Sequence, residues 1–215
     1  MTQINSNGLQ LNDTLAADLD GVLSELDLRD ATLVGFSMGG GEVARYIGRY
    51  GDDRVASVVF AAAVPPYLLK TDDNPGGGLA DEDIAGMKEG ASSDREAFLD
   101  EFTTNFFSAG GELKVSEDQR QEALEMEKAA GDDALVACID SFGRTDFRDD
   151  LAKITVPTLV LHGDSDATVP FEVSGKRTAD TVAGAELVVI GDGPHGCNVS
   201  HADEFNRALL DFLGR

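Results

Sequence analysis

The pentapeptide Gly-Phe-Ser-Met-Gly at positions 35–39 constrains the fold of this chain more than any other stretch. The apolar run at 32–34 before it is typical of a buried β-strand, and a helical pattern follows at once. Strand, G-x-S-x-G and helix predict a sharp turn that raises the serine hydroxyl above a sheet, and the glycines permit this turn without a Cβ clash. Ser37 is therefore a candidate nucleophile, and the Met38 N–H at the helix start is a candidate oxyanion donor. A glycine-rich turn with an incidental serine is the alternative interpretation.

Composition limits the size of the domain and the kinds of partner. The 215 residues, of which 42% are hydrophobic, suit one globular domain with room for a small insertion. Acidic residues number 40 against 17 basic ones, which gives a net charge of −23. Such a surface repels nucleic acid and anionic membranes, so we expect neither as a partner. The excess of acidic residues over lysine also predicts adaptation to a salt-rich habitat.

Adjacent aspartates recur along the chain, at 52–53, 72–73, 132–133 and 149–150. A metal site needs further oxygen ligands at fixed spacing, as in a calcium-binding loop, and these pairs lack that surrounding pattern. We therefore predict a solvated acidic face and no metal site.

Cysteine usage and the chain start favour a cytoplasmic protein. Cys138 and Cys197 form no C-x-x-C pair, so free thiols are expected. The first residues lack the basic region and apolar core of a signal peptide. The longest apolar run, 55–69, is interrupted by a proline pair and is too short to span a bilayer, so no membrane insertion is expected.

Strand and helix patterns alternate along most of the chain. Large apolar residues at helical spacing predict a helix that begins at 13 or 14, with a buried stripe through Leu15, Leu19, Val22, Leu23 and Leu26. The remaining expected elements are strands at 55–60, 156–162 and 186–190, helices at 40–50 and 171–182, and a final helix capped by Ser200. Parallel strands with helical crossovers make an α/β sheet.

The alternation stops between residues 65 and 144. Short amphipathic helices are predicted at 81–90, 93–108, 116–130 and 132–142, with capping boxes that begin at Ser93 and Ser116. We interpret 65–144 as a helical cap over the carboxyl edge of the sheet, and 1–64 with 145–215 as the core. The aromatic cluster Phe102, Phe106 and Phe107 is interpreted as the interior of the cap, with a substrate wall as the alternative.

Loops after strands carry the residues that chemistry needs. Ser37, Asp166 and His195 follow one another in the chain order serine, acid, histidine, each after a predicted strand. His195 is placed to take the serine proton as a base and return it as an acid, while the aspartate orients and stabilises the imidazolium. Asp164 is a rival acid because it lies nearer the strand end, and Asp192 is a weaker rival in the histidine loop.

The chain has 3 histidines, and their places relative to the predicted strands and helices suggest different roles. His162 ends a predicted strand and is expected to be a packed structural residue. His201 opens the last helix and is expected to face solvent. His195, on a loop after the last strand, is therefore the favoured base.

Several motifs together resemble the cofactor-free bacterial haloperoxidases and aryl esterases of the α/β-hydrolase superfamily. The matching stretches are 35–46, Ala63-Val-Pro-Pro, Asn74-Pro-Gly-Gly, Thr145-Asp-Phe, 156–166 and Gly193-Pro-His-Gly. The resemblance places the acid at Asp166 and implies hydrolysis of small acyl or aryl esters through an acyl-enzyme, without metal or haem. It also implies perhydrolysis, in which hydrogen peroxide replaces water and the peracid oxidises halide. Phe36 and Val169 are the expected substrate contacts.

The chain departs from this family at its start. The resemblance implies several strands and a His-Gly loop before the first helix, and that loop supplies a second oxyanion donor. Here the helix comes almost first, so we expect the strand at 31–36 to be a sheet edge. A symmetric homo-oligomer is the predicted cover, with a hairpin of residues 1–12 as the alternative.

The function interpretations therefore belong to different classes. The first is a serine esterase. The second is a catalytically impaired hydrolase remnant that binds a small ligand or serves as an interaction module, because losing one oxyanion donor lowers the rate on the order of a hundredfold.

Overall fold

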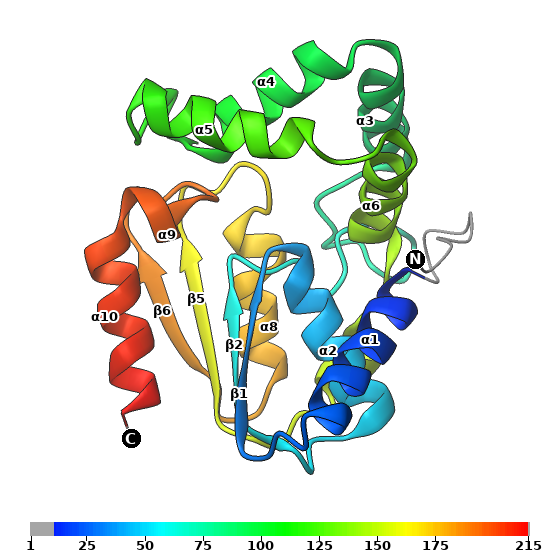
Figure 1. Ribbon diagram of the computed structural model, residues 1–215, viewed down its shortest axis with the longest axis vertical. Helices are drawn as coiled ribbons and strands as arrows, with labels where there is room; N and C mark the ends of the chain where they lie inside the picture. Colours follow the sequence, from blue (N-terminus) through cyan, green and yellow to red (C-terminus); the bar gives the residue numbers. More distant parts are fainter. Residues whose placement is uncertain (1–10, 215) are drawn as a thin grey trace.

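Parallel strands form the centre of the structure (Figure 1). The computed structural model describes residues 11–214. Its main sheet has the strand order β1-β2-β5-β6, and every adjacent pair is parallel. These strands are β1 (Ala31–Phe36), β2 (Val55–Ala61), β5 (Thr158–Gly163) and β6 (Glu186–Ile190). The predicted α/β architecture is confirmed, and the parallel register brings the carboxyl ends of all these strands to one edge.

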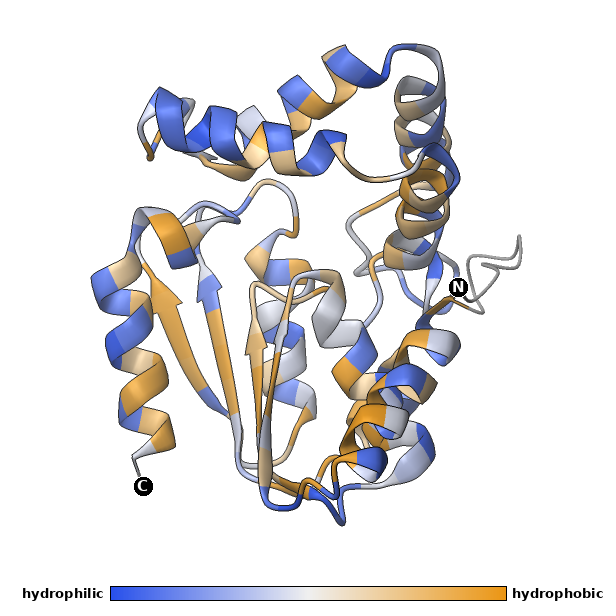
Figure 2. Ribbon diagram, in the orientation of Figure 1, coloured by the Kyte–Doolittle hydropathy of each residue, from blue (hydrophilic) through white to orange (hydrophobic). Residues whose placement is uncertain are grey.

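Each face of the sheet has its own hydrophobic core. The flanking helices are α1 (Leu11–Glu25), α2 (Met38–Tyr50), α7 (Arg148–Leu151), α8 (Gly175–Thr181), α9 (Cys197–Ser200) and α10 (Ala202–Leu213). Val58 and Phe60 of β2 pack in the core that contains α1 and α2, whereas Val59 packs in the core that contains α10. Successive strand residues point to opposite faces, so β2 serves both cores and is hydrophobic and buried from Val58 to Ala61 (Figure 2).

The buried face of α1 differs from the predicted stripe. Ala16 and Leu23 are buried, but Val22 and Leu26 are 51% and 66% exposed. A small Ala16 lets α1 approach its neighbour closely, and the distance between packed helices depends on such contact residues. The prediction is therefore confirmed for Leu23 and for Leu19, which packs against the same core, and is wrong for Val22 and Leu26.

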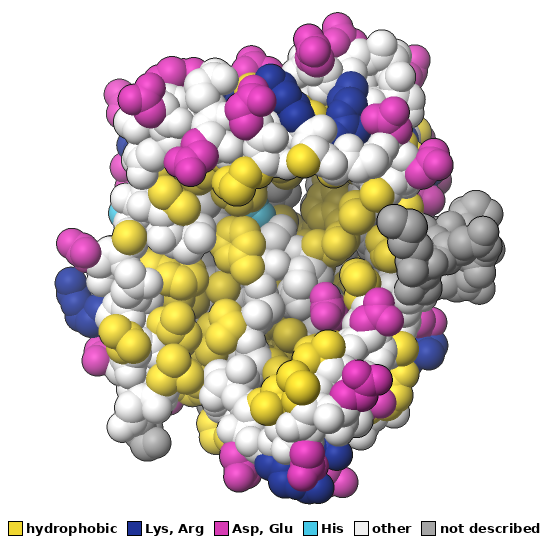
Figure 3. Space-filling model, in the orientation of Figure 1, with side chains coloured by type: hydrophobic (Ala, Val, Ile, Leu, Met, Phe, Trp, Pro, Cys, Tyr) yellow, Lys and Arg dark blue, Asp and Glu magenta, His cyan; other side chains and the backbone are white. Residues whose placement is uncertain are grey.

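Strand β1 is an edge of the sheet, as the sequence predicts. Among residues 11–214 it pairs with β2 alone, and the Val34 side chain is 48% exposed. Figure 3 shows hydrophobic side chains gathered over the strands on the visible face, with acidic side chains around them on the cap and the lower rim. The homo-oligomer stays a prediction, and the alternative hairpin falls mainly outside the described residues.

A layer of helices lies above the carboxyl ends of the strands (Figure 1). It consists of α3 (Asp81–Ser93), α4 (Arg95–Phe106), α5 (Glu117–Lys128) and α6 (Asp132–Arg144). The predicted helical cap is thus present, whereas its exact boundaries stay a prediction. A short antiparallel pair, β3 (Ser108–Ala109) and β4 (Glu112–Leu113), separates α4 from α5 and was not predicted. Within the described part of the chain, no helix is long and apolar enough to cross a membrane.

The structure tests the predicted caps at the starts of the helices. Ser116 forms the predicted capping box, with its hydroxyl accepting from the Gln119 N–H. The prediction for Ser93 is wrong, because Asp94 caps α4 by accepting from the Ala97 N–H at 3.2 Å. Ser200 is wrong too, because it ends α9 instead of capping α10.

The helix predicted at 171–182 is broken near its start. A 3₁₀ turn, η2 (Phe171–Val173), comes first, and α8 begins only at Gly175. Between them Ser174 has φ −129° and ψ −86°, outside the helical region.

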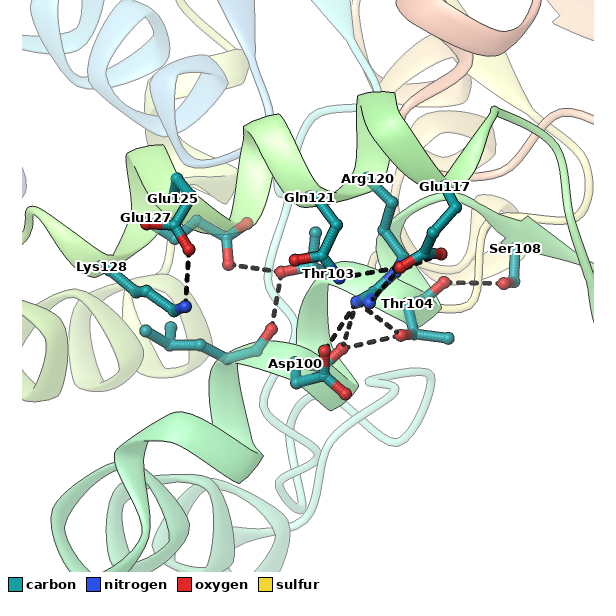
Figure 4. Close-up of polar contacts among 11 residues, drawn as sticks. Asp100, Thr103, Thr104, Ser108, Glu117, Arg120, Gln121, Glu125, Glu127 and Lys128 are labelled. Carbon is teal, nitrogen blue, oxygen red and sulfur yellow. Dashed lines mark hydrogen bonds and ion pairs between the residues drawn. The ribbon is translucent and has the colours of Figure 1, made fainter.

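A buried arginine joins α4 to α5 in the cap (Figure 4). Arg120 donates to the Asp100 carboxylate at 2.8 Å and to Glu117 at 2.7 Å, and its side chain is 9% exposed. Nearby, the Thr103 hydroxyl donates to Glu127 at 2.7 Å. Glu117 belongs to α5 like Arg120, so the bonds that join α4 to α5 are those from Arg120 to Asp100 and from Thr103 to Glu127.

Candidate active site

Ser37 occupies the sharp turn between β1 and α2. Its backbone lies in the left-handed half of conformational space, with φ 53° and ψ −123°. Such a backbone costs about 1–3 kcal/mol and persists only when the surroundings determine it. The Ser37 N–H donates to the Ala61 carbonyl at 3.0 Å, and its own carbonyl accepts from the Val64 N–H at 3.2 Å. Gly35 supplies the space, because a Cβ there would lie 2.6 Å from the Gly39 carbonyl oxygen.

Hydrogen bonds connect the predicted serine, histidine and acid in one chain. His195 Nε2 lies 2.9 Å from Ser37 Oγ, and His195 Nδ1 lies 2.7 Å from Asp166 Oδ2. The serine comes from the β1–α2 turn, the acid from the loop after β5, and the histidine from the loop after β6. The parallel register explains the meeting, because these loops all leave the same edge of the sheet.

The acid is held in its ionised form. Burial acts to raise the pKa of Asp166, but hydrogen bonds from His162 and His195 outweigh burial and lower that pKa. Its Oδ1 also accepts from the backbone N–H groups of Thr168 at 2.9 Å and Val169 at 2.8 Å. A carboxylate here accepts the hydrogen on His195 Nδ1, which leaves Nε2 free to accept the serine hydroxyl hydrogen.

The alternative acids, Asp164 and Asp192, form their hydrogen bonds and ion pairs away from His195. Asp164 Oδ1 accepts from the Asp192 N–H at 2.8 Å and from the Ser165 hydroxyl at 3.0 Å, so it bridges the two loops. The Asp192 carboxylate forms an ion pair with Lys114 at 2.7 Å. Only Asp166, among these aspartates, contacts the ring of His195.

The prediction that His162 is packed in the interior is confirmed, whereas His201 is less exposed than expected. His162 is fully buried at the end of β5. His201 is half-buried, and its Nδ1 lies 2.9 Å from the Ser200 hydroxyl. Neither contacts Ser37.

Met38 is the first residue of α2, so its N–H has no carbonyl one turn earlier to bond. The positive end of the helix adds to the attraction for a developing negative charge beside Ser37. The position of this backbone group directly after Ser37 fits the predicted oxyanion donor, and that role stays a prediction.

An aromatic side chain of the cap reaches the histidine. The Phe106 ring meets the His195 ring edge-on, with centroids 4.8 Å apart, and Phe36 lies 5.3 Å from the same ring. Phe106 is half-buried, whereas Phe107 is buried behind it. The interpretation of this cluster as cap interior is therefore wrong for Phe106. The sequence carried a signal for the contact between Phe106 and His195, because Phe106 and Phe107 are adjacent at the end of one helix.

The expected substrate contacts differ in their surroundings. Phe36 is half-buried beside His195, at a surface that a substrate could touch. Val169 has no exposed surface and packs in the hydrophobic core, while its backbone binds Asp166 and His162. Its position therefore supports a part in fixing the acid loop.

Comparison with known proteins identifies the fold family. A family model of the alpha/beta hydrolase fold matches residues 11–202. The chain belongs to the α/β-hydrolase family. A bromoperoxidase from Bacillus anthracis has a crystal structure with 51% sequence identity and a TM-score of 0.94. That match covers 100% of this α/β hydrolase and 77% of the bromoperoxidase chain.

Relatives in sequence place this α/β hydrolase more narrowly. A non-heme chloroperoxidase of Kitasatospora aureofaciens is 43% identical over 206 residues, 94% of this chain and 74% of that protein. A bifunctional esterase/perhydrolase of Acinetobacter calcoaceticus is 37% identical over 203 residues, 94% of this chain and 73% of that protein. The resemblance to the bacterial haloperoxidases and esterases is therefore confirmed.

Proposed function

We propose that this α/β hydrolase is a serine carboxylesterase that cleaves small acyl or aryl esters through an acyl-enzyme. The observation that carries the proposal is the hydrogen-bonded chain from Ser37 Oγ through His195 to the Asp166 carboxylate. Each member comes from a different loop, and an incidental serine turn would not require either partner.

Acylation begins with transfer of the Ser37 hydroxyl proton to His195 Nε2 while Oγ bonds to the ester carbonyl carbon. The carbonyl oxygen becomes an oxyanion beside the Met38 N–H. Asp166 stabilises the imidazolium during this step. His195 then gives its proton to the alcohol oxygen as the ester C–O bond breaks, which leaves the acyl group on Ser37.

Deacylation repeats these steps with water as the nucleophile. His195 takes a proton from water, the acyl carbon passes from Ser37 Oγ to the water oxygen, and the serine regains its proton. With hydrogen peroxide in place of water, the same steps release a peracid. The esterase/perhydrolase and haloperoxidase relatives support this second use of the acyl-enzyme.

The surface around the histidine favours small, apolar acyl or aryl groups. Phe36 and Phe106 present aromatic rings beside His195, which suits an apolar substrate group better than a charged one. In this proposal Val169 helps to fix the loop that carries Asp166.

A hydrolysis assay with p-nitrophenyl acetate tests the proposal. Wild-type protein is compared with Ser37→Ala, a change that removes one hydroxyl at the turn, and with Ser165→Ala as a matched half-buried serine outside the triad. We expect turnover by wild type and Ser165→Ala and only background release by Ser37→Ala. Equal rates for wild type and Ser37→Ala would instead support the remnant that binds without catalysis.

A further inference from the structure

A second histidine lies against the catalytic acid. His162 Nε2 is 3.2 Å from Asp166 Oδ2, the oxygen that also contacts His195 Nδ1 at 2.7 Å. The same Nε2 lies 2.8 Å from the Val169 carbonyl oxygen. The side chains of His162 and Asp166 have no exposed surface, and the 3.2 Å distance is a direct contact between them.

The surroundings of His162 decide which ring nitrogen carries the hydrogen. Nε2 faces acceptors on both sides, the Val169 carbonyl and the Asp166 carboxylate, so it must be the donor. Nδ1 is buried without a hydrogen-bond partner among residues 11–214. A Cβ on Gly175 would lie 2.5 Å from Nδ1, so the chain leaves no room there for a partner atom. The ring is thus fixed as an Nε2–H donor.

We propose that His162 is a positioning residue of the catalytic site, whose Nε2–H fixes the Asp166 oxygen that binds His195. The inference rests on the proposed triad chemistry and adds a member to it. With this bond, each carboxylate oxygen of Asp166 is held from the protein side: Oδ1 by the backbone of Thr168 and Val169, and Oδ2 by His162. The carboxylate cannot rotate away from His195 without breaking these bonds.

The donor also adjusts the charge that His195 experiences. The positive end of the Nε2–H dipole points at Oδ2, so it withdraws some of the negative potential that would stabilise the imidazolium. Its hydrogen bond is the largest of the interactions that lower the pKa of Asp166. Removing the donor leaves Oδ2 more negative and free to turn away from His195 Nδ1, so the hydrogen bond that orients His195 changes.

The other ionisable groups near His195 are the same with and without the His162 donor. Burial raises the pKa of the Cys197 thiol, on the next turn, to about 12, so it is uncharged at neutral pH. Asp192 is paired with Lys114 from the cap, and Asp164 binds the Asp192 N–H. The cap contributes the uncharged Phe106 ring.

Two substitutions separate the donor from the packing. His162→Met fills a similar volume without an N–H, whereas His162→Gln places an amide N–H near the position of Nε2. The NMR signal of the proton on His195 Nδ1 reports its hydrogen bond to Asp166 without turnover, and kcat for p-nitrophenyl acetate reports the consequence for the reaction. We expect His162→Met to move that signal and to lower kcat roughly tenfold, while His162→Gln stays close to wild type in both.

The two readouts keep this inference distinct from the esterase proposal. An inactive wild type in which the signal of the His195 Nδ1 proton still moves in His162→Met and not in His162→Gln would overturn the esterase and retain the positioning role. An unchanged signal in all three proteins, or equal changes of the signal in both variants with unchanged thermal unfolding, would overturn the positioning role.

Discussion

The Phe106 carbonyl oxygen of the cap accepts a hydrogen bond from the Gly196 N–H at 2.8 Å, one residue after His195. The cap therefore contacts the loop that carries His195 through this backbone hydrogen bond as well as through the Phe106 ring. The ion pair between Lys114 and Asp192 joins the same two segments at 2.7 Å. The cap and the histidine loop are joined by these contacts, so a change where they meet is expected to alter the position of His195 and thereby the rate of catalysis.

Gly196→Ala tests this contact. A Cβ at this position would lie 2.5 Å from the Phe107 ring, so the ring or the histidine loop must shift. Overpacking of this kind costs about 1–3 kcal/mol, and here it displaces His195. We expect a loss of kcat in a folded protein. Gly191→Ala is the matched control in the same loop, because its Cβ would meet nothing within 4 Å. Equal activity of the two variants would contradict the role assigned to the contact.

The choice of acid gives a second prediction. Asp166→Asn removes the charge that stabilises the imidazolium, so we expect kcat to fall by on the order of 10³–10⁴. Asp164→Asn changes a carboxylate that accepts from the Asp192 N–H, so its effect on kcat is expected to be small. Steady-state kinetics of both variants measure the contrast. A larger loss from Asp164→Asn would show that the acid is assigned to the wrong residue.

Folding is expected to depend on pH through Asp166. Burial acts to raise its pKa, but hydrogen bonds from His162 and His195 lower it below the unfolded value of about 3.9. The ionised form therefore contributes stability that is complete above the unfolded value and is lost as pH falls through the folded value. Urea titrations of wild type and Asp166→Asn are expected to differ most at neutral pH and to converge below about pH 4. A difference independent of pH would contradict this coupling.

Salt is expected to stabilise the fold. A net charge of −23 on 215 residues repels itself, and salt screens that repulsion. We expect the melting temperature to rise between about 0.1 M and 1 M sodium chloride. Potassium chloride serves as the control, because screening depends on ionic strength and not on the identity of the cation. A melting temperature that stays constant or falls would count against the prediction.

The sequence was informative where local pattern and chain order decide the structure. Ser37 lies at a turn that needs a particular strand–helix junction, and the order of Ser37, Asp166 and His195 follows from loops at one sheet edge. Phe106 and the exposed Val22 were assigned wrongly, because their burial depends on which distant element packs against them. His162 was correctly placed in the interior, but its bond to Asp166 depends on loop geometry that spacing does not reveal.

Trapping the acyl-enzyme tests the central claim most directly. Wild-type protein and Ser37→Ala are mixed with p-nitrophenyl acetate, quenched in acid within the first turnover, digested and analysed by mass spectrometry. The account predicts an acetyl group on Ser37 in the wild type and no acetyl-enzyme in Ser37→Ala. Release of p-nitrophenol by wild type without acetylated Ser37, or an equal rate of release by Ser37→Ala, would contradict it.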